Sequence, residues 1–194
     1  GLNGAHQIAN AVVAARTLEV GAERGIGATH QDIVTALSEV EWPARLEWLR
    51  VRQNQHVLID AAHNPAGAHA LADYLRAADV APLPVVLAVM KDKDIDAIVR
   101  ALVPAVSQFV ATEVASARCT PATELAVRIK RLSPQSDVVT RPDPQIAIAA
   151  ALTRSALAAI AGSIFLVGPV RAQLIQRGAA PVRYSSDGHP LFLS

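Results

Sequence analysis

The feature that most limits how this chain can fold is the alternation, from residue 46 onward, of short apolar runs with longer amphipathic segments. Runs such as PVVLAV are apolar at every position, which is typical of strands buried on both faces of a sheet. The first run, LEWLRV, instead alternates apolar and polar residues, and RQN joins it to HVLID as in an antiparallel hairpin. We therefore expect an α/β fold with a mostly parallel six-stranded, Rossmann-like sheet, helices on both faces and an antiparallel edge strand.

The expected boundaries follow from the apolar runs and from the proline, glycine and N-cap residues around them. The strands are expected at residues 46–51, 56–60, 84–89, 107–112, 137–140 and 163–167. The helices that alternate with them are expected at residues 64–77, 95–102, 121–132, 143–160 and 168–178.

Two more helices are expected ahead of the sheet, at residues 5–24 and 30–39. Thr29, followed three residues later by Asp32, is close to a capping box for the second helix, and Pro43 stops any helix there. The two helices are too small to hold a core of their own, so we expect a helical hairpin that leans on another structure. The expected organisation is a hairpin at 1–40, a linker at 41–45 and a main domain at 46–194.

Charge and cysteine content exclude several classes of function. The net charge of +1 gives no basis for a general nucleic-acid surface. The single cysteine, Cys119, fits a reducing compartment, and no signal peptide is visible, so a cytoplasmic location is expected. The most apolar region, 146–167, is too interrupted to span a membrane. There is no hydrolase G-x-S-x-G elbow, and Asp60, His63 and His69 do not have a zinc spacing, so no protein-held metal is expected.

Polar clusters follow the expected strands at the ends where parallel α/β sheets bind their ligands. Residues 60–64 follow the second strand, and MKDKD, TEVASAR and GPVR follow the third, fourth and sixth. Parallel strands place these ends along one edge of the sheet, so we expect a binding site there.

One of these clusters resembles a known family. DAAHNP, at residues 60–65, is similar to the DGAHNP signature of folylpolyglutamate and dihydrofolate synthases. These enzymes belong to the Mur ligase superfamily of ATP-dependent amide-bond ligases. Four more pieces resemble the family in the same order: a His-Gln-x-x-Asn-Ala helix in GAHQIANAVVAA, a Pro-Gly-Arg-x-Glu linker in WPARLE, an Asp-Lys-Asp stretch in MKDKD and a Gly-Ser segment in GSIFLVGPVR.

The chain departs from a complete ligase of this family in one major respect. No G-x-x-x-x-G-K-[ST] phosphate-binding loop occurs in it, and two family glycines are replaced by Ala61 and Ala44. It also starts without methionine and enters a helical pattern at once. We therefore expect the carboxy-terminal part of a longer enzyme: the last helices of an ATPase domain, which is otherwise missing, then the linker and the glutamate-ligase domain.

The resemblance implies a set of nucleotide-binding residues. Arg45 is expected to reach ATP from the linker, where a guanidinium suits phosphate or ribose oxygens; without the resemblance it is a surface arginine. Asp60 is expected to accept ribose hydroxyls or, alternatively, to cap the following helix. One face of the first helix is expected to lie against adenine, and its alternative is a solvated face; its residues are His6, Gln7 and Asn10.

The resemblance also implies residues at the amino-acid end. His63 is expected to bind a strand-end hydroxyl or a substrate carboxylate, with Ser163 as its partner, whereas Asn64 and Pro65 start the next helix. Lys93 is expected near the glutamate carboxylates, or else in a solvated charged turn. Two other cations after strands, Arg118 and Arg171, are further candidates for carboxylate binding.

The expected function is the glutamate-ligase domain of an ATP-dependent acid–amino-acid ligase in folate metabolism. It would position L-glutamate for attack on the acyl phosphate of a folate or dihydropteroate, a contribution based on proximity. ATP and Mg²⁺ are expected to be held mainly by the missing ATPase domain, so the chain alone is expected to be inactive. The alternatives are a stand-alone binding module of the same fold and the equivalent domain of another Mur-type ligase, because cyanophycin synthetase carries a similar triplet.

Overall fold

A computed structural model describes residues 4–25, 27–185 and 189–192 of the chain, without the side chains of Ala5 and His6. Its described strands form one sheet in the order β5-β4-β3-β6-β2-β1-β7. The strands are β1 (Glu47–Arg52), β2 (Gln55–Ile59), β3 (Leu83–Leu87), β4 (Val106–Ala111), β5 (Asp137–Thr140), β6 (Leu157–Ala161) and β7 (Ala180–Pro181). The helices are α1 (Ala5–Ala22), α2 (His30–Glu39), α3 (Pro65–Ala77), α4 (Ile95–Leu102), α5 (Ala122–Leu132), α6 (Pro144–Arg154) and α7 (Ile164–Gln176), with a short 3-10 turn at Val103–Ala105.

The mostly parallel sheet expected from the sequence is confirmed. β2, β6, β3, β4 and β5 all run parallel to one another, and β1 pairs antiparallel with β2. The count of six strands is wrong, because β7 pairs antiparallel with β1 and takes the edge position expected for β1. β7 has only two residues, one of them Pro181, so it offers no periodicity that a sequence pattern could detect.

The boundary between α6 and β6 also differs from the expectation. The expected helix 143–160 ends at Arg154, and its last residues form β6 instead. Alanine is the best helix former, so LAAIA looked like a continuation of the helix. It is instead a central strand between β2 and β3, with Ala158 and Ile160 fully buried. The expected strand 163–167 accordingly falls in the first turns of α7.

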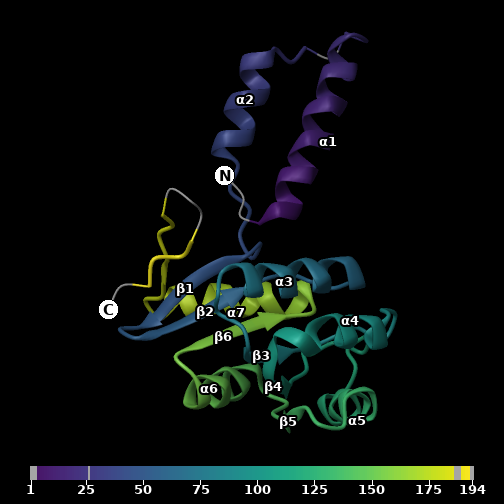
Figure 1. The fold of residues 1–194 in the computed structure, drawn as a ribbon, viewed down its shortest axis with the longest axis vertical. Coiled ribbons are helices and arrows are strands. Elements are labelled where there is room, and N and C mark those ends of the chain that lie inside the picture. Colours follow the sequence, from purple (N-terminus) through teal and green to yellow (C-terminus); the bar gives the residue numbers. More distant parts are fainter. Residues whose placement is uncertain (1–3, 26, 186–188, 193–194) are drawn as a thin grey trace.

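Helices cover both faces of the sheet, as expected (Figure 1). On one face the buried residues of α3, α4 and α5 pack with one set of strand side chains, including Trp48 and Phe109. On the other face α6 and α7 pack with the alternate set, including Leu49 and Ile160. The two cores leave the loops at the strand ends free to carry polar residues.

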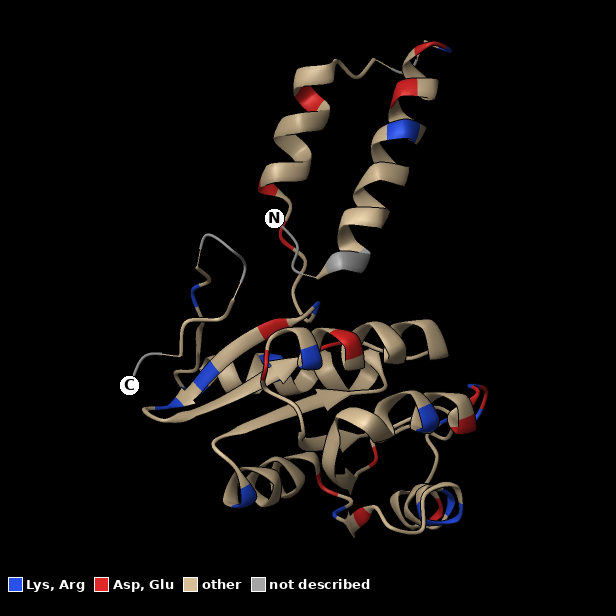
Figure 2. Cartoon of the chain, in the orientation of Figure 1, with Lys and Arg blue, Asp and Glu red and all other residues tan. Residues whose placement is uncertain are grey.

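The hairpin of α1 and α2 rises away from the sheet (Figure 1). The expected capping box is present, since the Thr29 side chain accepts from the Asp32 amide and the Asp32 carboxylate accepts from the Thr29 amide. Much of the hairpin carries neither acidic nor basic residues (Figure 2), and Ile8 and Val12 are 69% and 64% exposed. The single chain therefore leaves an apolar surface of α1 uncovered, and the expectation that the hairpin leans on another structure stays a prediction. No helix in the described ranges is both long enough and apolar enough to cross a membrane.

Candidate functional site

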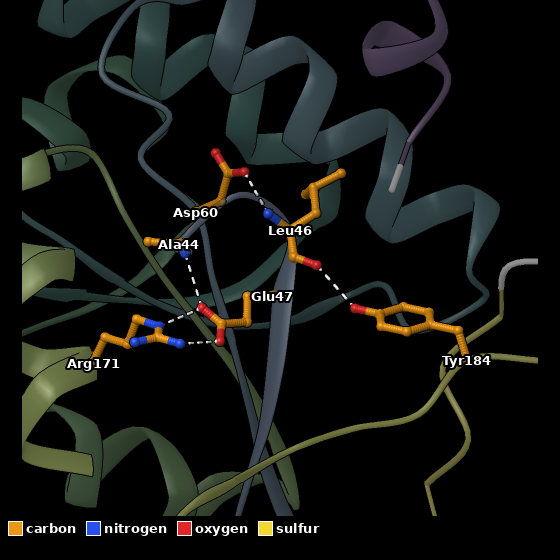
Figure 3. Close-up of polar contacts among 6 residues, drawn as sticks. All are labelled: Ala44, Leu46, Glu47, Asp60, Arg171 and Tyr184. Carbon is orange, nitrogen blue, oxygen red and sulfur yellow. Dashed lines mark hydrogen bonds and ion pairs between the residues drawn. The ribbon is translucent and has the colours of Figure 1, made fainter. Parts of the chain in front are cut away.

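The linker before β1 is held in an unusual backbone conformation. Ala44 and Leu46 both have positive φ, at 61° and 47°, on either side of Arg45. The left-handed region costs a side-chain-bearing residue roughly 1–2 kcal/mol. The neighbouring structure secures these residues, because the amide of Ala61 donates to the carbonyl of Ala44 at 3.1 Å and the hydroxyl of Tyr184 donates to the carbonyl of Leu46 at 2.9 Å (Figure 3). A positive φ at Ala44 is the conformation that glycine adopts most easily.

Glu47 ties the linker to α7. Its Oε2 accepts from the Ala44 amide at 2.8 Å and from Arg171 Nε at 2.7 Å, while Oε1 accepts from Arg171 Nη2 at 2.9 Å (Figure 3). Arg171 lies inside α7, and the sequence had also placed it in a helix, at 168–178. The carboxylate that it binds belongs to this chain.

Arg45 lies between these anchored residues and is half-buried. Its guanidinium carbon lies 5.6 Å from the ring centroid of Trp42, over the ring. Arg45 also lines a cavity of about 670 Å³ that lies between α1 and α2 and reaches the linker. Gln7 and Asn10 line it too, and most of its other lining residues are apolar. Three of the five expected nucleotide residues thus meet in one cavity of the size that small ligands occupy. Asp60 is not among its lining residues, and the side chain of His6 lies outside the described residues.

Asp60 follows β2 directly and is buried, with 5% of its surface exposed. Its Oδ2 accepts from the Leu46 amide at 2.9 Å (Figure 3). Burial raises the pKa of this carboxyl to about 6, against the opposing effects of the Leu46 amide, Arg45, the Ala62 amide and His63. Asp60 does not cap the next helix, as one interpretation had it, because Asn64 takes that position.

His63 and Asn64 form the start of α3. The Asn64 side chain accepts from the amide of Gly67 at 2.7 Å, and Pro65 is the first helical residue, so their expected capping role is confirmed. His63 Nδ1 lies 2.7 Å from the carbonyl of Ala61. A carbonyl only accepts, so Nδ1 carries the proton and Nε2 of a neutral ring keeps a lone pair for another partner.

Ser163 caps α7 at the end of β6, not the start of a strand as expected. Its Oγ accepts from the amide of Phe165 at 3.1 Å, and the residue is 2% exposed. The preceding Gly162 has φ 102°, and a Cβ there would lie 2.4 Å from the carbonyl oxygen of Ala88 after β3. Only glycine lets β6 and β3 approach so closely, and this approach fixes Ser163 at the carboxyl edge.

Lys93 lies in the loop after β3, within a small charged cluster. Lys93 Nζ and Arg118 Nη2 each lie 3.1 Å from a carboxylate oxygen of Asp92. The hydrogen bonds from Lys93 and Arg118 lower the pKa of Asp92. The backbone of Lys91 bonds to the carbonyl of Arg118 at 2.8 Å, so the loops after β3 and β4 form one unit. Cations outnumber carboxylates in this cluster, which suits an anionic ligand.

The loops that carry these residues lie next to one another. They follow β2, β6, β3 and β4, which are consecutive and parallel in the sheet, so Asp60, Ser163, Lys93 and Arg118 share its carboxyl edge. No group of three or more His, Cys, Asp or Glu residues suited to a metal occurs in the described part of the chain. Sequence reasoning missed Glu47, although it ends the linker motif, and Tyr184, for which no motif gave a signal.

Comparisons with known proteins agree with this arrangement. The family described as Mur ligase, glutamate ligase domain, matches residues 44–170. A dihydrofolate synthase/folylpolyglutamate synthase of Mycobacterium tuberculosis is 44% identical over 131 residues, which cover 65% of this chain and 26% of that protein. A dihydrofolate synthetase of Saccharomyces cerevisiae is 32% identical over 119 residues, covering 57% and 28%.

Solved structures with a similar fold include two folylpolyglutamate synthases. Folylpolyglutamate synthase of Mycobacterium tuberculosis, complexed with ADP, aligns with a TM-score of 0.76 and 31% identity over 93% of this chain and 42% of that one. The enzyme of Thermotoga maritima aligns with a TM-score of 0.67 and 30% identity, covering 90% and 39%. The chain thus spans about a quarter of the length of the curated relatives. Given the family match over most of the main domain, the chain belongs to the Mur ligase family as a glutamate ligase domain.

Proposed function

We propose that this chain is the glutamate-ligase domain of an ATP-dependent folylpolyglutamate or dihydrofolate synthase. The observation that carries the proposal is the meeting of Arg45, Gln7 and Asn10 in one cavity between the hairpin helices and the linker. This cavity offers a cation for phosphate and an amide for a base, and the relatives named above are folate-linked synthases. The single cysteine fits a reducing compartment and so supports a cytoplasmic location for this reaction.

The residues at the linker fit a nucleotide. Arg45 has no ion pair among the described residues, so its charge is available to a phosphate group. Asn10 is exposed and its amide can donate and accept along one edge of adenine, while Asp60 can accept from ribose hydroxyls with the oxygen that Leu46 does not use. Bound ATP would supply the phosphoryl group that activates the folate carboxylate.

In this proposal, Mg²⁺ binds together with the nucleotide and not at a separate site in this chain. The described residues hold no cluster of metal ligands, so we propose that the ion is held by the phosphates and by residues of an ATPase domain, a common arrangement for Mg²⁺.

The loops at the carboxyl edge fit glutamate. Lys93 would bind its carboxylates, with Arg118 next to it on the same cluster. His63, whose Nε2 keeps a lone pair, would accept from Ser163 or from the substrate amine. The chain would then hold the amine facing the folate acyl phosphate. The attack would form the amide C–N bond while the acyl C–O bond to the phosphate breaks, so inorganic phosphate would leave and the amine would lose a proton. Proximity and orientation, not covalent participation, would be the contribution of the chain.

The proposal is tested by assaying the gene product that contains this chain together with an ATP-binding domain. The substrates are ATP, glutamate, and one of three acceptors: dihydropteroate, a reduced folate, or a cell-wall nucleotide-peptide precursor. We expect glutamate-dependent ADP release and a glutamylated pterin product, detected by mass spectrometry, with one or both of the first two acceptors. Activity only with the cell-wall precursor would move the domain to another Mur-type ligase, and no activity with any acceptor would favour a non-catalytic binding module.

A further inference from the structure

The conformation of the linker at Arg45 depends on groups outside the linker. Arg45 stands between two non-glycine residues of positive φ, Ala44 and Leu46. Such residues are uncommon and persist only where the surrounding structure fixes them. The direction of the Arg45 side chain depends on both peptides, so whatever holds them also aims the guanidinium.

Both flanking residues are bonded at their amide and at their carbonyl. The Ala44 amide donates to Glu47 and the Leu46 amide donates to Asp60, at 2.8 and 2.9 Å. Their carbonyls accept from the Ala61 amide and from the Tyr184 hydroxyl, at 3.1 and 2.9 Å. Rotating either residue out of the left-handed region would break bonds on both of its sides.

Glu47 is the member of this set that also reaches across the molecule. Its carboxylate is 16% exposed and makes two bonds to Arg171, which fixes its rotation. Arg171 lies in α7, the helix that Ser163 caps. The helix that contains the arginine locking the linker is therefore capped by a residue of the candidate glutamate end.

We propose that Glu47, locked by Arg171, is a positioning residue that holds Arg45 in the orientation needed for the nucleotide. This inference rests on the proposed function, because it assigns Arg45 to ATP. Glu47 touches no substrate and acts through the Ala44 amide.

The first test is kinetic and uses the gene product that contains this chain with its ATP-binding domain. For Glu47→Gln we expect KM for ATP to rise about tenfold or more, while KM for glutamate stays within about twofold. The double variant Glu47→Gln/Arg45→Ala should be no worse than Arg45→Ala alone, because residues that act through one another are not additive. Arg171→Lys keeps the charge but loses the two-bond geometry, so its KM for ATP should lie between the values for wild type and Glu47→Gln.

The control is Asp137→Asn, which breaks an ion pair with Arg154 at the start of β5, away from the carboxyl edge. It should leave both KM values unchanged. Equal rises in the two KM values for Glu47→Gln, or additive effects in the double variant, would overturn the positioning role.

The second test needs no turnover and uses the 194-residue chain. Amide hydrogen exchange should show Ala44 protected in the wild type and exchanging at least about tenfold faster in Glu47→Gln, with Asp137→Asn unchanged. Unchanged protection in Glu47→Gln would overturn the inference by itself. Absence of turnover in the wild type would instead refute the proposed function, so the two failures are distinguishable.

Discussion

Asp60 shows that burying a single carboxylate has a cost in stability. It is buried after β2, and its pKa is raised to about 6 from an ordinary value of 3.8. The folded chain therefore binds more protons than the unfolded chain between these two values. Stability must fall as pH rises through this window, since the charged form is the one that burial penalises. A strongly shifted pKa of a buried carboxyl group is more frequent at functional sites than elsewhere in proteins.

Replacing Asp60 with asparagine should therefore stabilise the chain above about pH 6. The amide oxygen of asparagine can still accept from the Leu46 amide, and the buried charge is gone. The change in pKa corresponds to up to about 3 kcal/mol of unfolding free energy at pH 7.5, with little difference near pH 4. Denaturant unfolding of both proteins across this range measures it, with the exposed Asp73→Asn as control. A stability difference that does not change with pH would contradict the buried-carboxylate account.

A second prediction at this scale concerns Ala44, which has a φ of 61° although it is not glycine. Ala44→Gly relieves the left-handed strain but gives the unfolded chain more freedom. We expect the unfolding free energy to rise by about 0.5–1 kcal/mol, measured by urea denaturation. The same change at Ala66, on the exposed side of α3, should lower stability by about 1 kcal/mol. If Ala44→Gly and Ala66→Gly lower the unfolding free energy equally, the positive φ of Ala44 carries no strain.

The candidate site could be predicted residue by residue only in part. Arg45, Gln7 and Asn10 were expected to serve one nucleotide, and they do share a cavity. The residues that shape the linker could not be foreseen, because Glu47 meets Arg171 across 124 positions of sequence and Tyr184 meets Leu46 across 138. Such pairings depend on the sheet order and leave no local pattern.

Among the elements, the junction of β6 and α7 decides where the edge of the site lies. The sequence expectation placed a strand after Gly162, whereas the structure places one before it. Local propensity favoured a helix through LAAIA, and burial between β2 and β3 overrode it. The capped helices were easier to predict, since Asn64 with Pro65 and Asp143 with Pro144 mark the starts of α3 and α6.

Gly162 should be the least replaceable residue of this junction. An alanine Cβ would lie 2.4 Å from the Ala88 carbonyl, in a backbone of φ 102°. We expect Gly162→Ala to lower the unfolding free energy by about 3 kcal/mol or more, or to prevent folding. Gly168→Ala, inside α7 with open space around its Cβ, should be neutral or stabilising by up to about 1 kcal/mol. Thermal unfolding of both variants measures the contrast, and a Gly162→Ala protein as stable as wild type would contradict the close packing of β6 and β3.

On the scale of the whole molecule, the chain is a packed α/β domain with a helical hairpin that stands away from it (Figure 1). The domain has a core on each face of its sheet, whereas the hairpin exposes Ile8, Val12 and Val13. The sequence pattern predicted a hairpin with too few residues for a core of its own. The cavity at the linker is lined by residues of α1 and α2 together with Val40, Trp42 and Arg45.

The central claim is that this domain supplies the amino-acid half of an ATP-dependent ligase and depends on an ATPase domain for the nucleotide phosphates. The most direct measurement is glutamate-dependent ADP release, with ATP and a folate acceptor, by the 194-residue chain alone and by the gene product in which it follows an ATP-binding domain. We predict no turnover above background for the chain alone, and turnover for the longer protein that falls by about a hundredfold or more in Arg45→Ala. Turnover by the isolated chain, or a longer protein unaffected by Arg45→Ala, would contradict the account.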